Sequence, residues 1–215
     1  MENRICYDEI SQYIRSVINR EKGLLKKMEE YARLNHIPII NPESAAFLKV
    51  LTKIHKPLRI LEVGTAIGYS SIIIAKASPL AVIDTIEIDE DIAKIAEKNI
   101  GTSGVEERIR VIVGDALEVM QCLSATYDMI FLDAAKGQYI EYFPEALRLL
   151  NPGGILISDN ILYKGLVAQK GQVIHKHRTI TNKLREYIKL ICNDKDLETS
   201  IIPIGDGMAV SFKER

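Results

Sequence analysis

The sequence predicts a single α/β domain, with a mostly parallel β-sheet that has helices on both faces and ends in an antiparallel pair of strands. Short β-branched runs alternate with helical stretches from about Leu58 onward, which indicates βαβ units. Two further runs near the C-terminus flank Gly205-Asp206-Gly207, a pattern typical of a hairpin turn. With 215 residues, of which 47% are hydrophobic, the chain is long enough for one well-buried domain and short for two. We therefore expect residues 1–215 to form one domain.

Residues 1–56 are expected to form a helical cover in front of the sheet. Apolar residues recur at helical spacing in Ile10–Val17 and Leu24–Tyr31, and Ser44–Ile54 resumes the pattern. The prolines of Ile37–Pro42 interrupt it, either as a lid over a site or as a plain connection between helices. Residues 57–215 form the core, and its expected strands are Arg59–Val63, Val82–Ile86, Arg110–Val113, Met129–Leu132, Ile155–Ser158, Thr199–Ile204 and Met208–Phe212.

Composition excludes several classes of protein. No stretch approaches the roughly eighteen apolar residues of a membrane span, and the charged N-terminus lacks the apolar core of a signal peptide, so we expect a cytoplasmic protein. Cys6, Cys122 and Cys192 are too few and too widely spaced for a disulfide framework or a zinc site. The net charge of −1 gives no overall indication of a nucleic-acid partner. A near-neutral total can still include a local basic patch, so the distribution of charge along the chain is the informative property.

A glycine-containing loop, Glu62–Ser70, follows the first strand. Its glycines lie where a ligand would meet a helix N-terminus at the carboxyl end of the sheet, which is typical of nucleotide binding. A dinucleotide fingerprint needs a middle glycine, but Ala66 occupies that place and the acid Glu62 precedes the loop. This disfavours an NAD(P) oxidoreductase and favours a cationic ligand. The second strand ends near Glu87, where an acid can accept both hydroxyls of a ribose. We predict a nucleoside-cofactor site here rather than a purely structural turn.

Polar residues also follow the fourth and fifth strands. Asp133 and Lys136 come after the fourth, and Asp159 and Asn160 after the fifth, so all should converge on the crevice of the glycine loop. Two carboxylates and an amide oxygen are hard ligands suited to Mg²⁺, and zinc is disfavoured because no histidine or cysteine accompanies them. Taken singly, each acid has an ordinary alternative as a helix cap or a polar turn, and the lysine as a solvated side chain.

Taken together, these motifs resemble the cation-dependent class I O-methyltransferases, the family of the catechol and caffeoyl-CoA methyltransferases. The patterns E-x-G-x-x-x-G-Y-S, D-x-x-K and D-N occur in order, and the resemblance extends from about Ile37 to the C-terminus. It implies a Rossmann-like, seven-stranded sheet, S-adenosylmethionine as cofactor and a homodimer. It also implies Asp133, Asp159 and Asn160 as metal ligands, with Lys136 as the general base. The implied cofactor contacts are Glu62, Gly64, Ala66, Gly68, Tyr69, Ser70, Glu87, Asp115, Ala116 and Asp133.

The substrate is predicted from the segment that follows Asn160. Ile161 to Arg185 contains six basic residues and no Asp or Glu, and it begins at the expected metal site. It therefore forms a basic border that favours a polyanionic substrate, the alternative being a solvated helix face. We expect substrate contacts from Lys164, Lys170, Lys176 and Arg178.

Local runs such as Lys164–Val167 and Ile202–Gly207 resemble the bacterial branch of the family, which methylates 5-hydroxyuridine at the wobble position of tRNA to 5-methoxyuridine. The 5-hydroxyl and O4 of that base form a vicinal oxygen pair like that of a catechol, and an anticodon loop is single-stranded. We therefore expect the tRNA anticodon loop as partner, with a small catechol or caffeoyl-type phenol as the alternative substrate. A cofactor-binding module without catalysis is disfavoured because the ligands and the lysine are all present.

Overall fold

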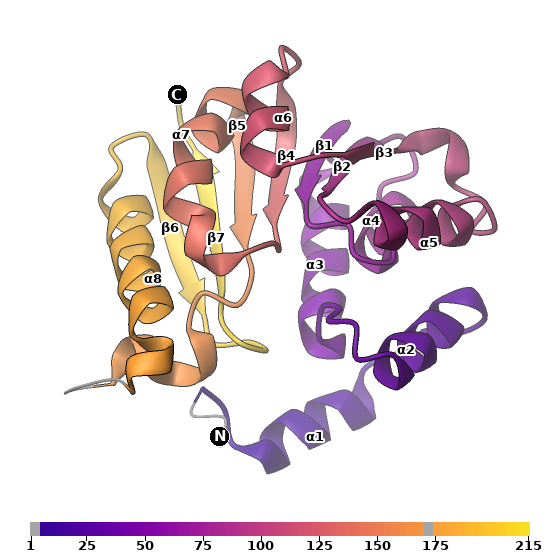
Figure 1. The fold of residues 1–215 in the computed structure, drawn as a ribbon, viewed down its shortest axis with the longest axis horizontal. Helices are drawn as coiled ribbons and strands as arrows, with labels where there is room; N and C mark the ends of the chain where they lie inside the picture. Colours follow the sequence, from indigo (N-terminus) through magenta and orange to yellow (C-terminus); the bar gives the residue numbers. More distant parts are fainter. Residues whose placement is uncertain (1–4, 170–173) are drawn as a thin grey trace.

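One seven-stranded sheet organises the fold (Figure 1). The computed structural model describes residues 5–169 and 174–215. The strand order is β3-β2-β1-β4-β5-β7-β6, in which β1 to β5 are parallel and β7 runs antiparallel to both of its neighbours. The predicted mostly parallel sheet and its antiparallel C-terminal pair are confirmed. The strands are β1 (Arg59–Val63), β2 (Val82–Glu87), β3 (Ile109–Val113), β4 (Tyr127–Leu132), β5 (Leu150–Ser158), β6 (Leu197–Ile202) and β7 (Met208–Lys213).

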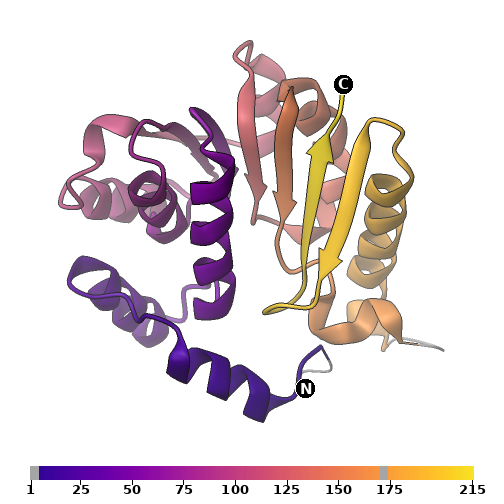
Figure 2. The ribbon, with the colours of Figure 1, turned by 180° about the vertical axis from the view of Figure 1, so that it is seen from behind.

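Helices cover both faces of the sheet. One face is packed by α2 (Leu24–Leu34), α3 (Pro42–His55), α4 (Tyr69–Ala77) and α5 (Glu90–Ile100), and the other by α6 (Ala116–Cys122), α7 (Tyr139–Leu149) and α8 (His175–Asn193) (Figures 1 and 2). Short 3₁₀ helices are η1 (Glu106–Arg108), η2 (Lys136–Gln138) and η3 (Tyr163–Ala168). In the described part of the chain, no helix is long and apolar enough to cross a membrane.

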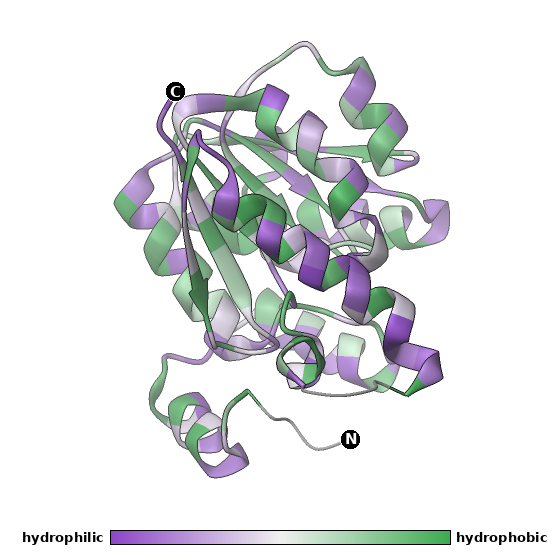
Figure 3. Cartoon of the chain, turned by 90° about the vertical axis from the view of Figure 1, so that its left-hand side faces the viewer, coloured by the Kyte–Doolittle hydropathy of each residue, from purple (hydrophilic) through white to green (hydrophobic). Residues whose placement is uncertain are grey.

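The two cores follow from the alternation of side chains along the strands. Ile60 contributes to the core under α3 and α4, whereas Leu61 contributes to the core under α6 and α7, and neither is exposed at all. Complete burial of such a side chain stabilises the fold by about 1.5–3 kcal/mol. Figure 3 shows the result: the strands are mostly hydrophobic, and the hydrophilic positions concentrate on the helices.

The first helix, α1 (Asp8–Val17), lies beyond the carboxyl ends of the parallel strands (Figure 1). None of its residues is buried, and Tyr13 and Val17 are largely exposed. Arg15 holds it to α3 through two hydrogen bonds of 2.7 Å to the carboxylate of the buried Glu43. The N-terminal segment thus contains the helices α1 to α3, and a bidentate ion pair attaches the outermost of them to α3.

Most strands differ from the prediction by one or two residues at an end, and the start of β5 differs by five. We expected the sixth strand to reach Ile204, but β6 ends at Ile202 because Pro203 has no N–H to donate to a neighbouring strand. We expected the fifth strand to begin at Ile155, but β5 begins at Leu150, which pairs with Tyr127 across an irregularity in the register.

Candidate active site

The glycine loop passes directly over the end of β4. Gly64 has a φ of +104°, and a Cβ at this position would lie 2.3 Å from the backbone oxygen of Asp133. A side chain larger than hydrogen is therefore excluded, and the loop and Asp133 lie next to each other as the sequence predicts. Ala66 follows in the left-handed region at φ 45°, a conformation that non-glycine residues rarely adopt.

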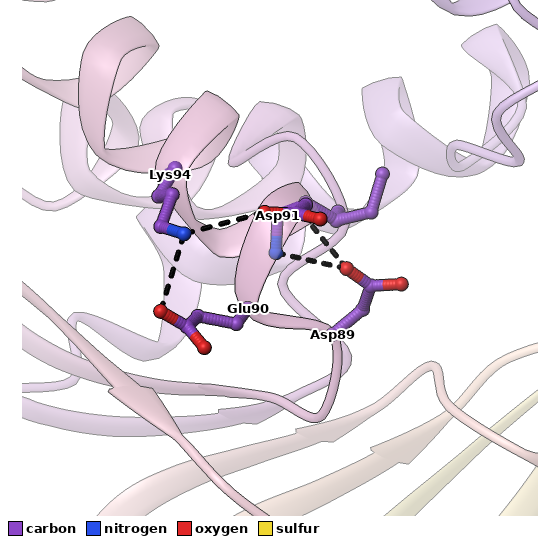
Figure 4. Close-up of polar contacts among 5 residues, drawn as sticks. Asp89, Glu90, Asp91 and Lys94 are labelled. Carbon is purple, nitrogen blue, oxygen red and sulfur yellow. Dashed lines mark hydrogen bonds and ion pairs between the residues drawn. The ribbon is translucent and has the colours of Figure 1, made fainter.

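Glu87, at the end of β2, fixes this strained loop. Its Oε2 accepts a hydrogen bond of 2.8 Å from the backbone N–H of Ala66, and its Oε1 accepts one of 3.0 Å from that of Asp89. Asp89 in turn caps α5 by accepting from the N–H groups of Asp91 and Ile92, and Lys94 pairs with Glu90 and Asp91 on the next turn (Figure 4). Glu87 is thus held at the cavity by its backbone partners.

A cavity of about 340 Å³ lies at the carboxyl ends of the first four strands. This volume is in the range of small-molecule sites, roughly 300–1,000 Å³. Residues of the Ile37–Pro42 segment and of α7, including Ile40 and Tyr142, complete the wall. No sequence pattern indicated Tyr142 as a site residue beyond its place on an apolar helix face. Ten of the predicted site residues line it: Gly64, Ala66, Tyr69, Ser70, Glu87, Asp115, Ala116, Asp133, Lys136 and Asn160.

Glu62, Gly68 and Asp159 are not part of that wall, and Asp159 lies buried behind it. Glu62 is completely buried behind the loop, where its Oε2 accepts hydrogen bonds from the hydroxyls of Ser71 and Thr85. Burial raises its pKa, and its Oε1 has no hydrogen-bond partner among the described residues. Gly68 caps the start of α4 with a φ of +82°. A direct contact of Glu62 or Gly68 with a cofactor stays a prediction; the structure places both of them as supports of the loop.

Asp133 and Asp159 bring two carboxylates together after β4 and β5. Asp159 is 1% exposed, its Oδ1 accepts a 2.7 Å hydrogen bond from the N–H of Asn160, and its buried Oδ2 has no partner among the described residues. Burial raises the pKa of Asp133 well above its usual range, and the carboxylate of Asp159 raises it further. Asn160 adopts a left-handed φ of 57° beside them. The predicted trio therefore converges, with one carboxylate oxygen that nothing in the described chain satisfies.

Lys136 begins η2 and supplies the positive charge of the site. It lines the cavity, and its positive charge counteracts the raised pKa of Asp133 and of Asp159. The site thus places one nitrogen base candidate beside two acids, as the D-x-x-K pattern predicts.

The metal-free protein should lose stability as pH rises toward neutrality. Burial raises the pKa of Asp159 to about 6, against an ordinary value of 3.8. An acid whose pKa is higher in the folded state favours folding below its unfolded pKa, and this contribution of about 3 kcal/mol is lost as pH rises through the folded value. We expect calorimetry in EDTA to show a lower Tm at pH 7 than at pH 5, and Asp159→Asn to lose less Tm over this interval. An equal change of Tm between pH 5 and pH 7 in the original protein and in Asp159→Asn would contradict the raised pKa of Asp159.

The basic segment divides into two groups. Lys164, Lys176 and Arg178 are exposed and form no ion pair within the described residues. Lys183 instead donates to the carbonyl of Gly137 and pairs with Glu141, and Arg185 donates to the carbonyls of Leu166, Val167 and Gln169. Lys170 lies outside the described residues. The predicted basic border therefore includes fewer exposed, unpaired cations among the described residues than the number of basic residues in the segment indicates.

Comparisons with known proteins decide the family. A family model described as O-methyltransferase matches residues 11–214. The chain belongs to this O-methyltransferase family. It is 33% identical to a catechol O-methyltransferase of Niastella koreensis over 174 residues, which is 78% of each chain. It is also 33% identical to a caffeoyl-CoA O-methyltransferase of Populus kitakamiensis over 218 residues, covering 94% of this chain and 92% of the relative.

Solved structures support the same O-methyltransferase fold. The O-methyltransferase TomG from Streptomyces achromogenes, in complex with SAM, superposes with a TM-score of 0.86 at 27% identity and full coverage of both chains. An O-methyltransferase from Bacillus cereus in complex with SAH gives 0.84 at 26% identity, covering 96% of this chain and 97% of that one. The predicted family and fold are confirmed, and the oxidoreductase alternative is set aside.

Proposed function

We propose that this protein transfers a methyl group from S-adenosylmethionine to a hydroxyl that has a second oxygen beside it on a planar ring, as in a catechol. The observation that carries the proposal is the cavity itself. Its wall joins the residues suited to a nucleoside, such as Glu87 and Asp115, to the polar group formed by Asp133, Asn160 and Lys136. The relatives and the SAM- and SAH-bound neighbours support this cofactor and this class of acceptor.

The residues fit the binding of a divalent cation. The described chain gathers no three His, Cys, Asp or Glu side chains as ligands, but the candidate set needs only two carboxylates and the amide oxygen of Asn160. The carboxylates of Asp133 and Asp159 repel each other, and the unpartnered Oδ2 of the buried Asp159 lacks the compensation that a buried charge requires. Asp133, Asp159 and Asn160 would hold the cation. When bound, it would supply the positive charge that lowers the pKa of an adjacent hydroxyl.

Lys136 completes the chemistry from the protein side. Its amine accepts the hydroxyl proton, the oxygen forms a bond to the methyl carbon, and the carbon–sulfur bond breaks to leave a neutral thioether. The loop around Ala66 and the carboxylate of Glu87 orient the cofactor so that its methyl group faces the acceptor, which removes much of the entropic cost of bringing the two together.

A matched pair of acceptors tests this proposal. Transfer from labelled S-adenosylmethionine is measured with Mg²⁺ and with EDTA, to catechol and to phenol, which lacks the second oxygen. We expect metal-dependent labelling of catechol and little of phenol. Equal labelling of both, or labelling that survives EDTA, would contradict the paired-oxygen mechanism.

The observation in favour of a second acceptor, wobble 5-hydroxyuridine in tRNA, is a pair of exposed cations in the first turn of α8. His177 accepts or donates a 2.8 Å hydrogen bond with the Tyr163 hydroxyl, which ties the first turn of α8 to the segment after Asn160. Lys176 and Arg178 flank His177 and are exposed. Such cations suit the phosphates of an anticodon loop. The same assay with tRNA that contains this nucleoside discriminates between the substrates: labelling at far lower concentration than catechol selects tRNA, and labelling of catechol alone selects small phenols.

The exposed cations also give a salt-dependence prediction. If they contact phosphates, replacing both Lys176 and Arg178 by Ala should weaken tRNA binding and flatten the slope of log affinity against log salt concentration by about 1.4, since each contact with single-stranded RNA contributes about 0.7. Filter binding at several salt concentrations measures the slope. The control replaces Lys189 and Lys195, exposed lysines at the distal end of α8 and beyond it. An unchanged slope in the Lys176 and Arg178 variant would indicate that these residues form a solvated helix face and do not contact phosphates.

The pairing of two chains, implied by the resemblance, likewise stays a proposal.

A further inference from the structure

The hairpin between β6 and β7 holds the loop that carries Asn160. The backbone carbonyls of Gly207 and Asp206 accept hydrogen bonds from the N–H groups of Ile161 (2.9 Å) and Leu162 (3.0 Å). The carboxylate of Asp206 accepts a third, of 2.5 Å, from the N–H of Lys164. Asp206 and Gly207 of the hairpin therefore accept hydrogen bonds from three backbone N–H groups of the loop.

The loop needs this support because its backbone is strained. Asn160, Tyr163 and Lys164 adopt φ values of 57°, 45° and 56°, which are left-handed conformations that L-residues avoid. These conformations are unfavourable relative to ordinary backbone, least so for Asn160, and they persist only where the surroundings enforce them. Without external hydrogen bonds the segment would relax, and the side chain of Asn160 would leave its place beside Asp159.

The backbone of the hairpin at Gly207 packs directly against the side chain of Leu162 in the loop. A Cβ at Gly207, where φ is +86°, would lie 2.2 Å from the Cγ of Leu162. The hairpin backbone therefore touches the loop directly. Of the three hydrogen bonds, only the one from the Lys164 backbone N–H is accepted by a side chain, that of Asp206, so a substitution of Asp206 can remove it without changing the backbone.

Asp206 also lies within electrostatic reach of the site. Burial raises its pKa, whereas the Lys164 N–H and the charge of Lys136 counteract that rise. Its own charge contributes to the raised pKa of Asp159. The Asp206 carboxylate, which accepts the hydrogen bond from the loop, therefore interacts electrostatically with both Asp159 and Lys136.

We propose that Asp206 is a positioning residue for methyl transfer, which holds the strained segment from Asn160 to Lys164 so that the Asn160 side chain stays beside Asp133 and Asp159. The inference rests on the proposed function for the reaction that this positioning serves. The hydrogen bond to a carboxylate is charge-assisted and stronger than one to a neutral acceptor, which suits it to a strained backbone.

Two substitutions separate the hydrogen bond from the charge. Asp206→Ala removes both, and Asp206→Asn keeps an oxygen acceptor for the Lys164 N–H. Glu198→Ala is the matched control, because Glu198 is an exposed acid in β6 of the same hairpin. Amide hydrogen exchange of the segment from Ile161 to Lys164 is measured in the metal-free proteins, with S-adenosylmethionine affinity, Mn²⁺ affinity, kcat and KM for catechol measured alongside.

We expect Asp206→Ala to speed exchange of these amides by about ten- to a hundredfold, the worth of a hydrogen bond to a charged group, while cofactor affinity stays within about twofold. Its Mn²⁺ affinity and kcat should fall by about tenfold or more, and both Asp206→Asn and Glu198→Ala should stay within about threefold of the original protein. Unchanged exchange and Mn²⁺ affinity in Asp206→Ala, or an equal loss in Asp206→Asn, would overturn the proposal. If no acceptor is methylated by the unsubstituted protein, the proposed function fails, but the exchange and Mn²⁺ measurements still decide the role of Asp206.

Discussion

Replacing Asp159 by Ala should abolish most methyl transfer and remove the response of the remaining activity to Mg²⁺ and EDTA. The substitution removes a buried carboxylate oxygen at the cavity end of β5 that lacks a partner in the described chain, and we assign this oxygen to a cation. A cation that stabilises developing negative charge is worth several kcal/mol, and each 1.4 kcal/mol is a factor of ten in rate. We therefore expect turnover of catechol to fall by about a thousandfold or more. Steady-state kinetics at saturating cofactor, with and without EDTA, measure it.

The loss should reflect chemistry and not unfolding. Asp159 carries a raised pKa, so its ionised form costs stability in the metal-free fold, and its removal should leave Tm at pH 7 unchanged or higher. Asp91→Ala is the matched control, because Asp91 is an exposed acid at the start of α5 (Figure 4) and should keep full activity. A fully active, EDTA-resistant Asp159→Ala protein would end the metal assignment.

The sheet could be predicted because local sequence and global fold agree. Every expected strand contains at least one β-branched residue, and the order of motifs after successive strands anticipates which residues meet at the carboxyl edge. The errors occur where one residue overrides the pattern. Pro203 ends β6 two residues before the apolar run ends, and Leu150 joins β5 through a register irregularity that has no local signal.

The site was predictable to the extent that strand ends determine it. Gly64, Asp133 and Asn160 meet because parallel strands end at one edge. Glu62 shows the limit: it has the same parity as Ile60, so the alternation of the strand turns its side chain toward α4 and away from the cavity. Strand periodicity carried this information, but the resemblance to a motif assigned Glu62 to the ligand.

Contacts between distant segments were beyond the sequence. Asp206 belongs to a hairpin turn, and only the insertion of β7 beside β5 brings it to the loop after Asn160. Arg185 donates only to backbone carbonyls among the described residues, and Lys183 donates to a backbone carbonyl and to the distant Glu141; the sequence does not indicate either set of partners. The basic segment thus contains residues that hydrogen-bond to other parts of the protein and residues that are exposed to solvent. The packing of α8 determines to which group each residue belongs.

Replacing Lys136 by Ala should lower turnover by about 10²–10⁴, the usual worth of a general base, and leave S-adenosylmethionine affinity nearly unchanged. The proton of the acceptor hydroxyl then has no nearby amine to accept it, whereas the loop and Glu87 that orient the cofactor are untouched. Single-turnover kinetics and cofactor titration measure the two quantities separately. Lys98→Ala, an exposed lysine of α5, is the control and should behave like the original protein. Unchanged turnover in Lys136→Ala would remove the residue from this role.

Lys136→Arg distinguishes a proton acceptor from a counter-charge. Because the positive charge of Lys136 counteracts the raised pKa of both carboxylates, that charge alone could account for its presence in the site. Arginine keeps that charge but does not give up its proton at any working pH, so it cannot serve as a base. If Lys136 accepts the proton, the arginine variant should be as slow as Lys136→Ala; if the charge alone matters, the arginine variant should recover most of the activity. The rate of the alanine variant should also rise with pH as hydroxide replaces the missing base, and a flat profile would favour the counter-charge.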